Sequence, residues 1–108
     1  MNATMILNRA EELREELIEN RRTLHSYAET GFDLPQTTAF VEKKLREYGL
    51  TPVRCGKAGI TCVIGDPKKG RCFLLRGDMD ALPMTEESGL PFAAQNGHCH
   101  SCGHDTHT

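Results

Sequence analysis

The segment that most constrains the fold is Cys72-Phe73-Leu74-Leu75, where four apolar residues follow one another without polar alternation. A strand with one solvated face alternates apolar and polar residues, whereas a continuous apolar run is typical of a strand buried on both faces. Such strands lie inside layered α/β sheets, which need helices on both sides. We therefore expect a strand over 71–76 in the interior of an α/β sheet.

Two amphipathic helices are predicted before this strand. Over residues 5–26, apolar residues recur mostly at intervals of three or four while charged residues occupy the other faces, which is typical of a helix with one buried stripe. A second helix is expected from Pro35, because proline at the first helical position loses no intrahelical hydrogen bond. Asp33 or Leu34 is expected near its N-cap, and Gly49 marks its end.

Two further strands are predicted between the second helix and the apolar run. Residues 51–55 and 60–64 are rich in β-forming residues and are followed by glycine-containing turns. The predicted fold class is α/β, with two N-terminal helices followed by three strands. Residues 77–108 have a loop-like composition, so two helices alone would have to cover both faces of the sheet. We therefore expect the incomplete start of a layered α/β catalytic domain.

Charge and cysteine content exclude several classes of protein. Thirteen Lys and Arg against 15 Asp and Glu give a formal net charge of -2, so no net basic field is present to hold nucleic acid. No apolar run is long enough for a membrane span or a signal-peptide core, and we expect a cytoplasmic protein. Five cysteines cannot form a complete set of disulfides within one chain. Three of them are expected to be buried in the predicted strands as small apolar residues: Cys55, Cys62 and Cys72.

Groups suited to chemistry are concentrated in residues 97–108, which contain four of the five histidines and two of the five cysteines. Thiolate sulfur and imidazole nitrogen are ligands of zinc and similar divalent metals. Cys102 and His104 flank one glycine, so a tight bend could direct both side chains to one ion. Asp105 could be a ligand, a bridge or an acceptor that orients an imidazole. A solvated histidine-rich segment without a function is the alternative.

A pair of carboxylates, Asp78 and Asp80, directly follows the predicted strand over 71–76. In open α/β sheets, ligands bind at the carboxyl ends of the strands. Residues two apart in an extended chain point the same way, so both carboxylates could face one cleft. A surface turn before Pro83 is the alternative.

Three motifs occur in order: RRTLH at 21–25 with ETGF at 29–32, RGDMDALP at 76–83, and HSCGHDTHT at 100–108. Together they resemble those of the metal-dependent amidohydrolases of the aminoacylase type, a family that includes hippurate hydrolase, indole-acetyl-amino-acid hydrolase and N-acetyl-diaminopimelate deacetylase. Members of that family are several times longer, with a catalytic α/β domain and a smaller lid and dimerisation domain. The resemblance implies that residues 1–108 are the N-terminal part of the catalytic domain, with the rest absent.

Carried onto this sequence, the resemblance implies that Cys102 and His104 are two ligands of a dinuclear centre of divalent metal ions, such as Zn, Mn, Co or Ni. Asp80 resembles the aspartate that supports the centre. The other ligands and a glutamate general base are expected beyond Thr108. The implied reaction is hydrolysis of N-acyl amino acids or similar small amides by a homo-oligomer. We expect the chain alone to be a truncated fragment without activity, or an inactive remnant.

Three other residues are expected to have no catalytic role. Glu86 and Glu87 are adjacent carboxylates in a loop and are expected to be solvated. His25 is expected to be a helix-end or packing residue rather than a ligand. Tyr27 and Ala28 depart from the family pattern, because they stand where a member often has histidine and proline.

The spacing of Cys99 and Cys102 also fits two other classes of site. One is a structural zinc module that would use both cysteines with His104 and His107, although such modules usually spread their ligand pairs across about a dozen residues. The other is a thiol redox site, which usually lies at a strand-to-helix junction.

Overall fold

The computed structural model describes residues 1–108 and contains both helices and strands. In chain order the elements are α1 (Ala3–Glu12), α2 (Arg14–Tyr27), α3 (Pro35–Glu47), β1 (Val53–Cys55), β2 (Gly59–Thr61) and the 3₁₀-helix η1 (His104–Thr106). None of the helices combines the length and the apolar character that crossing a membrane requires. The predicted α/β class is confirmed, although the helices and strands differ in number from the prediction.

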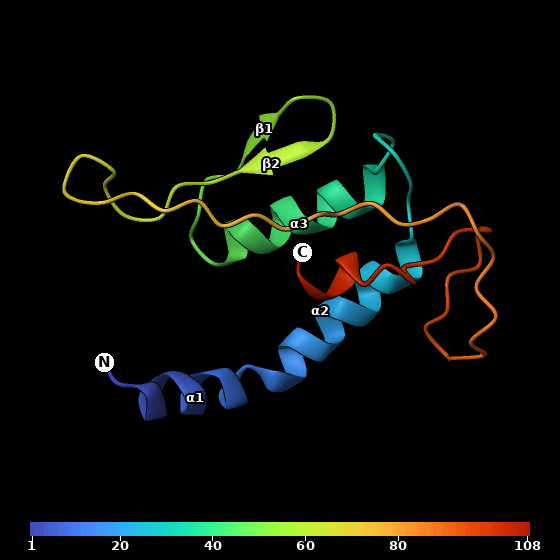
Figure 1. Cartoon of the computed structure of the whole chain (residues 1–108), viewed down its shortest axis with the longest axis horizontal. Helices are drawn as coiled ribbons and strands as arrows, with labels where there is room; N and C mark the ends of the chain where they lie inside the picture. The colour runs from blue at the N-terminus through green and yellow to red at the C-terminus, as the bar shows by residue number, and fades with distance from the viewer.

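The single helix predicted over 5–26 is divided at Leu13. The backbone N–H of Leu13 is shared between the carbonyl oxygens of Arg9 at 3.3 Å and Ala10 at 3.2 Å, which is a 3₁₀-like tightening of the turn. Beyond this point α1 leaves the direction of α2 (Figure 1) and buries none of its residues. The apolar side of α1 therefore faces solvent.

Helix α3 begins at Pro35, as predicted, but its N-terminus is capped by a residue six positions before Pro35 rather than by the N-cap residue. The N-cap residue, Leu34, offers no side-chain hydrogen bond. Instead, the buried carboxylate of Glu29 accepts the backbone N–H of Gln36 at 3.0 Å and that of Thr37 at 2.7 Å. These bonds satisfy two of the free N–H groups of the first turn and place a negative charge at the positive end of the helix dipole.

Glu29→Ala is expected to lower the free energy of unfolding by roughly 1–3 kcal/mol, because it leaves the N–H groups of the first turn of α3 unpaired. Chemical unfolding followed by helical circular dichroism measures the change. Glu19→Ala is the matched control, since Glu19 is an exposed glutamate on α2, and it should change stability by less than about 0.5 kcal/mol. Equal effects of the two substitutions would contradict the capping role.

Ala28 ends α2 with backbone angles of φ 39° and ψ 57° and is completely buried. The left-handed region costs a residue with a Cβ atom roughly 1–2 kcal/mol. Proline, whose ring fixes φ near about −65°, cannot adopt this conformation. The departure from the family pattern at this position is therefore compatible with the backbone observed here.

Strands β1 and β2 form an antiparallel hairpin in which Val53 lies opposite Thr61 and Cys55 lies opposite Gly59. The two strands predicted over 51–55 and 60–64 are thus present but shorter. The hairpin packs beside α3 through β2 (Figure 1).

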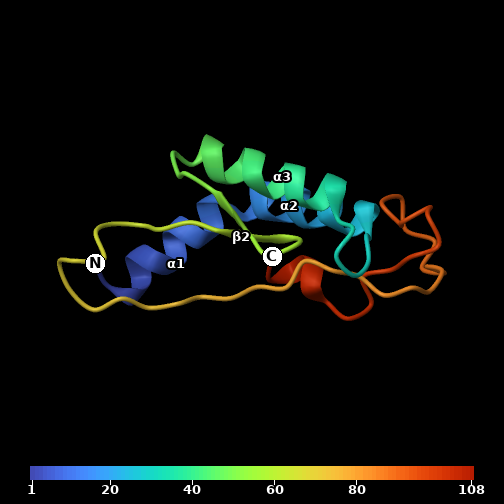
Figure 2. The ribbon, with the colours of Figure 1, turned by 90° about the horizontal axis from the view of Figure 1, so that it is seen from above.

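The third predicted strand, over 71–76, does not form. The segment runs along the molecule without joining a sheet (Figure 2), and no backbone hydrogen bond connects it to another segment. Phe73, Leu74 and Leu75 are 81%, 89% and 94% exposed. A strand needs a neighbour to bind its N–H and C=O groups, and no neighbour lies beside these residues. The cysteines expected to be buried in strands are instead exposed or half-buried: Cys55, Cys62 and Cys72.

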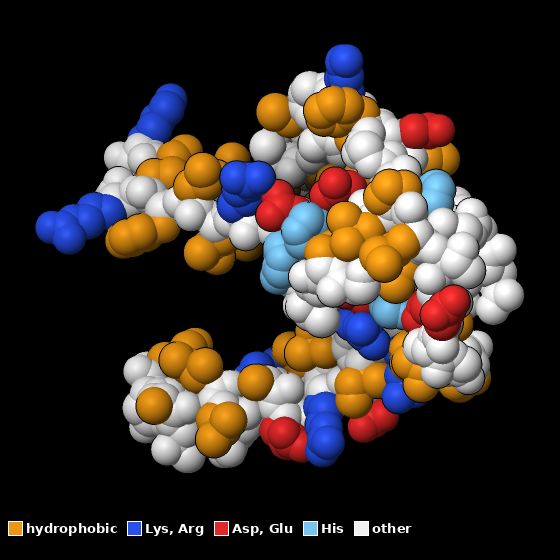
Figure 3. Space-filling model, turned by 45° about the vertical axis from the view of Figure 1, so that its right-hand side comes forward, with side chains coloured by type: hydrophobic (Ala, Val, Ile, Leu, Met, Phe, Trp, Pro, Cys, Tyr) orange, Lys and Arg blue, Asp and Glu red, His pale blue; other side chains and the backbone are white.

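The buried core is small and centres on Ala28, Ala81 and Ala94. The radius of gyration is 15.5 Å, whereas a compact domain of about 100 residues has about 13 Å. Figure 3 shows why, because two arms carrying hydrophobic side chains are separated by an open gap. Histidine and acidic side chains lie together where the arms join, and this junction holds the candidate site.

Candidate metal centre

Two segments distant in the sequence lie side by side at the junction. Leu82 and Cys99 exchange backbone hydrogen bonds of 2.9 and 3.0 Å. The N–H of Ala81 donates to the carbonyl oxygen of Glu29 at 2.7 Å, which ties the same segment to the end of α2. These contacts place the residues that follow the apolar run against the loop that contains most of the histidines.

His104 lies directly against Asp80. Its Nδ1 is 2.9 Å from the Asp80 carbonyl oxygen and 3.0 Å from the carboxylate Oδ1. Both partners are acceptors, so Nδ1 donates and the other ring nitrogen, Nε2, keeps its lone pair for a cation. A carboxylate that orients an imidazole in this way is common around metal ions. The structure therefore brings together two of the three predicted site residues.

The third predicted residue, Cys102, has an exposed thiol whose Sγ lies 3.8 Å from the same Asp80 carbonyl oxygen. Gly103 separates it from His104 and has φ 85°, a conformation that glycine adopts without steric cost. The predicted tight bend is present, and both side chains lie beside the same carbonyl group. Sulfur and nitrogen donors of this kind suit zinc and similar divalent metals.

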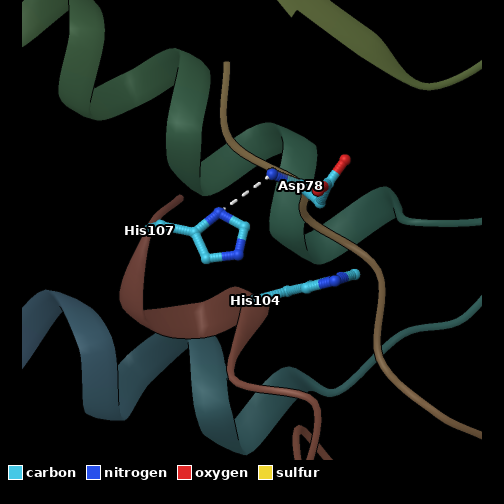
Figure 4. Close-up of side chains that lie close together, drawn as sticks. All are labelled: Asp78, His104 and His107. Atoms are coloured by element: carbon cyan, nitrogen blue, oxygen red, sulfur yellow. Dashed lines mark hydrogen bonds between the residues drawn. The ribbon is translucent and has the colours of Figure 1, made fainter. Parts of the chain in front are cut away.

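The structure also brings Asp78 and His107 to His104. One possible ligand atom from each of the three residues lies within 4.8 Å of the others. Figure 4 shows the two imidazole rings next to the extended segment that carries Asp78, and the Asp78 N–H donates to Nδ1 of His107 at 3.3 Å. The close approach depends on Gly77, because a Cβ atom there would overlap the carbonyl oxygen of His107.

The carboxylate of Asp78 also has a cationic neighbour. Arg76 donates to its Oδ1 at 2.7 Å, and this hydrogen bond lowers the pKa of Asp78 below its ordinary value of 3.8. Asp78 is therefore ionised at neutral pH, but a metal ion would have to compete with Arg76 for it. The sequence indicated Asp78 only as a carboxylate that could face a cleft and His107 only as a ligand of the alternative zinc module. That the two residues meet at His104 depends on the path of the exposed segment.

A row of buried charged side chains lies beneath these donors. His25, on α2, contacts Asp105 Oδ2 through Nδ1 at 2.7 Å and Glu86 Oε1 through Nε2 at 2.6 Å. Arg21, one turn earlier on α2, places Nε 2.8 Å from the same oxygen of Asp105. The side chains of His25, Asp105 and Glu86 are 7%, 0% and 4% exposed. The expected packing role of His25 is observed, with partners that the sequence did not reveal.

The expectation that Glu86 and Glu87 are both solvated is wrong for Glu86, while Glu87 is exposed. Burial would raise the pKa of Glu86. Hydrogen bonds from His25, Ser88 and the Ala94 N–H outweigh it and lower the pKa from 4.5 to about 2. The carboxylate is therefore ionised at neutral pH.

Because the pKa of Glu86 is lower in the folded than in the unfolded chain, its stabilising contribution is present above about pH 4.5 and is lost as the pH falls toward 2. We expect Glu86→Gln to make the free energy of unfolding depend less steeply on pH in this window. Urea unfolding at a series of pH values measures the slope. Glu87→Gln is the matched control and should keep the wild-type slope; a slope equally reduced in both variants would contradict the assignment.

His100 is buried beside His25, with the two ring centroids 6.2 Å apart. Neither ring nitrogen has a hydrogen-bond partner. Burial lowers the pKa of His100 below its ordinary value of 6.5, so the ring is neutral at pH 7. His100 therefore packs as an uncharged group next to the charged row.

The alternative sites are not assembled. A four-ligand zinc module would need Cys99, but this residue is buried and is held by its backbone bonds to Leu82. The only group of three or more possible ligands that lie together is Asp78, His104 and His107. Cys99 and Cys102 both lie in a loop, whereas the predicted redox site would lie at a strand-to-helix junction.

The mixed α/β fold brings sulfur, nitrogen and carboxylate groups together at its junction. Residues 74–108 match peptidase family M20/M25/M40. The resemblance given by the three motifs is confirmed: the chain is related to this family of hydrolases.

Individual relatives match this chain over only a short part of their own length. N-acetyl-L-cysteine deacetylase of Bacillus subtilis (strain 168) is 42% identical over 89% of this chain, which corresponds to 24% of that protein. A Rhodococcus jostii (strain RHA1) protein that carries the name of a glutamate–cysteine ligase is 44% identical over 98% of this chain but only 14% of its own length. The chain thus spans about a quarter or less of these relatives.

A solved structure supports the fold of this chain. The chain superposes on a dinuclear metal binding peptidase of the M20 family from Bacillus subtilis with a TM-score of 0.80 and 34% identity, over 88% of this chain and 27% of that one. Divalent metal ions are therefore the cofactors of this family, as predicted.

Proposed function

We propose that this chain forms the N-terminal part of the catalytic domain of an amidohydrolase that acts on N-acyl amino acids or similar small amides. Cys102 and His104 are the ligands that it contributes to a dinuclear centre of Zn, Mn, Co or Ni. The observation that carries the proposal is the hydrogen bond from His104 Nδ1 to Asp80, which leaves Nε2 free, while the Cys102 thiol lies 3.8 Å from the carbonyl oxygen of the same aspartate. The name of the Bacillus subtilis deacetylase supports the substrate class.

Bound divalent metal would supply a Lewis acid for the amide carbonyl and would lower the pKa of attacking water. The residues of this chain hold and orient the donors. Asp80 orients the ring of His104 by accepting a hydrogen bond from Nδ1, and Gly103 forms the bend that brings the Cys102 thiol to the same Asp80 carbonyl group. A hydrolytic centre needs about three protein ligands and a general base. The chain alone is therefore proposed to be inactive.

The location, the oligomeric state and the type of partner of the whole protein are proposed from the family resemblance. We propose a cytoplasmic homo-oligomer that acts on small molecules. The formal net charge of -2 supports the absence of a nucleic-acid partner.

A chimera tests the proposal. The corresponding segment of the Bacillus subtilis N-acetyl-L-cysteine deacetylase is replaced by this chain, and release of acetate from N-acetyl amino acids is measured with added Mn²⁺, Co²⁺ or Zn²⁺. We expect metal-dependent turnover by the chimera and none by the chain alone. A folded chimera without turnover would overturn the proposed role of the segment, and turnover by the chain alone would overturn its proposed inactivity.

A second candidate function is binding of a single cation by the chain itself, which the proximity of Asp78, His104 and His107 favours. Zinc titration of two variants separates the candidates. If this group is the site, His107→Gln weakens binding and Cys102→Ser does not; if the proposed dinuclear ligands are the site, the reverse holds.

A further inference from the structure

We propose that His25 is a positioning residue for the metal-binding loop: with Arg21, it holds Asp105 so that η1 presents His104 toward Asp80. The inference rests on the proposed function, because it concerns the same ligand. It assigns a task to the buried charged row that the proposed chemistry does not use directly.

The first step is the anchoring of Asp105. Its carboxylate is completely buried, and one oxygen lies 2.8 Å from Nε of Arg21 and 2.7 Å from Nδ1 of His25, both on α2. A buried carboxylate that lost these partners would be strongly destabilised. The position of Asp105 relative to α2 is therefore tightly fixed.

The second step is the link from Asp105 to His104. The two residues are neighbours in η1, which is a single 3₁₀ turn. Successive side chains of a 3₁₀-helix with three residues per turn point about 120° apart. With Asp105 directed at α2, His104 is directed away from α2, where it meets Asp80. Release of Asp105 would let η1 turn and would uncouple the imidazole from Asp80.

The third step is the second contact of His25. Glu86 accepts from Nε2 of His25 and is itself held by Ser88 Oγ at 2.7 Å and by the N–H of Ala94 at 2.6 Å. The two ring nitrogens of His25, Nδ1 and Nε2, thus contact two different carboxylates, those of Asp105 and Glu86. His25 thus cannot rotate toward one partner without losing the other.

Stability alone is a weak reason for such a row. Buried ion pairs can often be replaced by apolar residues without loss of stability, because removing charges from water costs about as much as their attraction returns. This chain has a small apolar core and nevertheless buries the side chains of His25, Asp105 and Glu86. A requirement for a fixed direction of η1 accounts for this arrangement.

Titration of the chain with Co²⁺ tests the inference, because a cobalt–thiolate absorption band reports binding at Cys102 and gives a dissociation constant. Cys102→Ser should abolish the band, and Cys72→Ser, at another exposed thiol, should retain it. We expect His25→Gln to weaken Co²⁺ binding by about 10- to 100-fold, as loss of groups that orient a ligand usually does. Helix content is measured by circular dichroism on the same samples.

Arg21→Gln keeps the test decisive if His25→Gln fails to fold, because Arg21 is partly exposed. It should weaken Co²⁺ binding several-fold, while Arg22→Gln should not, since Arg22 is the exposed neighbour on α2 and contacts Phe92 instead. Wild-type affinity in both folded His25→Gln and Arg21→Gln would overturn the inference and leave the proposed function intact. If His25→Gln does not fold, wild-type affinity of Arg21→Gln alone overturns it. Absence of the thiolate band in the wild-type chain would overturn both.

Discussion

Cys102→Ser and His104→Gln are each expected to lower kcat/KM of the deacetylase chimera by more than about 100-fold, whereas the loss of a group that only supports a ligand costs about 10- to 100-fold. The reason is that each substitution removes a donor atom beside Asp80 rather than an interaction that orients one. Steady-state hydrolysis of N-acetyl-L-cysteine at saturating Mn²⁺ or Zn²⁺ measures the loss.

Two further variants serve as comparisons for the losses expected of Cys102→Ser and His104→Gln. Asp80→Asn keeps the carbonyl acceptor for His104 but removes the charge, so its loss should be smaller than that of His104→Gln. Cys72→Ser alters an exposed thiol that belongs to neither group of possible ligands and should leave kcat/KM unchanged. Full activity of Cys102→Ser would show that sulfur is not a ligand and would favour the group formed by Asp78 and His107 with His104.

The chain alone is expected to self-associate, and the double substitution Phe73→Lys with Leu75→Lys is expected to make it monomeric. The segment exposes apolar side chains on both faces and unpaired backbone groups on both edges, which makes it a template for pairing with another strand. Analytical ultracentrifugation should give a mass well above 12.0 kDa for the wild-type chain and a mass near 12.0 kDa for the variant.

Ile6→Lys with Leu7→Lys provides the matched control. These residues are also exposed and apolar, but they lie on α1, whose backbone groups are mostly bonded within the helix. If strand pairing drives association, the control remains associated. A monomeric wild-type chain would contradict the prediction, and an equally monomeric control would attribute association to apolar area alone.

The sequence was a good guide where structure depends on neighbouring residues. Pro35 and Gly49 marked the limits of α3, and the glycines around β1 and β2 marked their hairpin. The segment 71–76 was predicted wrongly for a physical reason. Its composition suits a buried strand, but a strand exists only where another segment supplies hydrogen bonds and cover.

The candidate site shows the same division. Asp80 and His104 could be paired from motifs, and their contact is present. The contacts of His25 with Asp105 and Glu86 join residues 80 and 61 positions apart, and no local pattern indicates them. Glu86 was expected in solvent because adjacent loop carboxylates usually are, and only the fold reveals the donors that surround it.

The lack of a side chain at Gly77 has a consequence for sequence variation. The backbone at residue 77 lies so close to the carbonyl group of His107 that even a methyl group would push the two segments apart. Alanine at this position would keep every donor residue of the site but would change the distances between their donor atoms. We expect functional variants of this sequence to tolerate many replacements in the neighbouring exposed segment 71–76 while keeping glycine at residue 77.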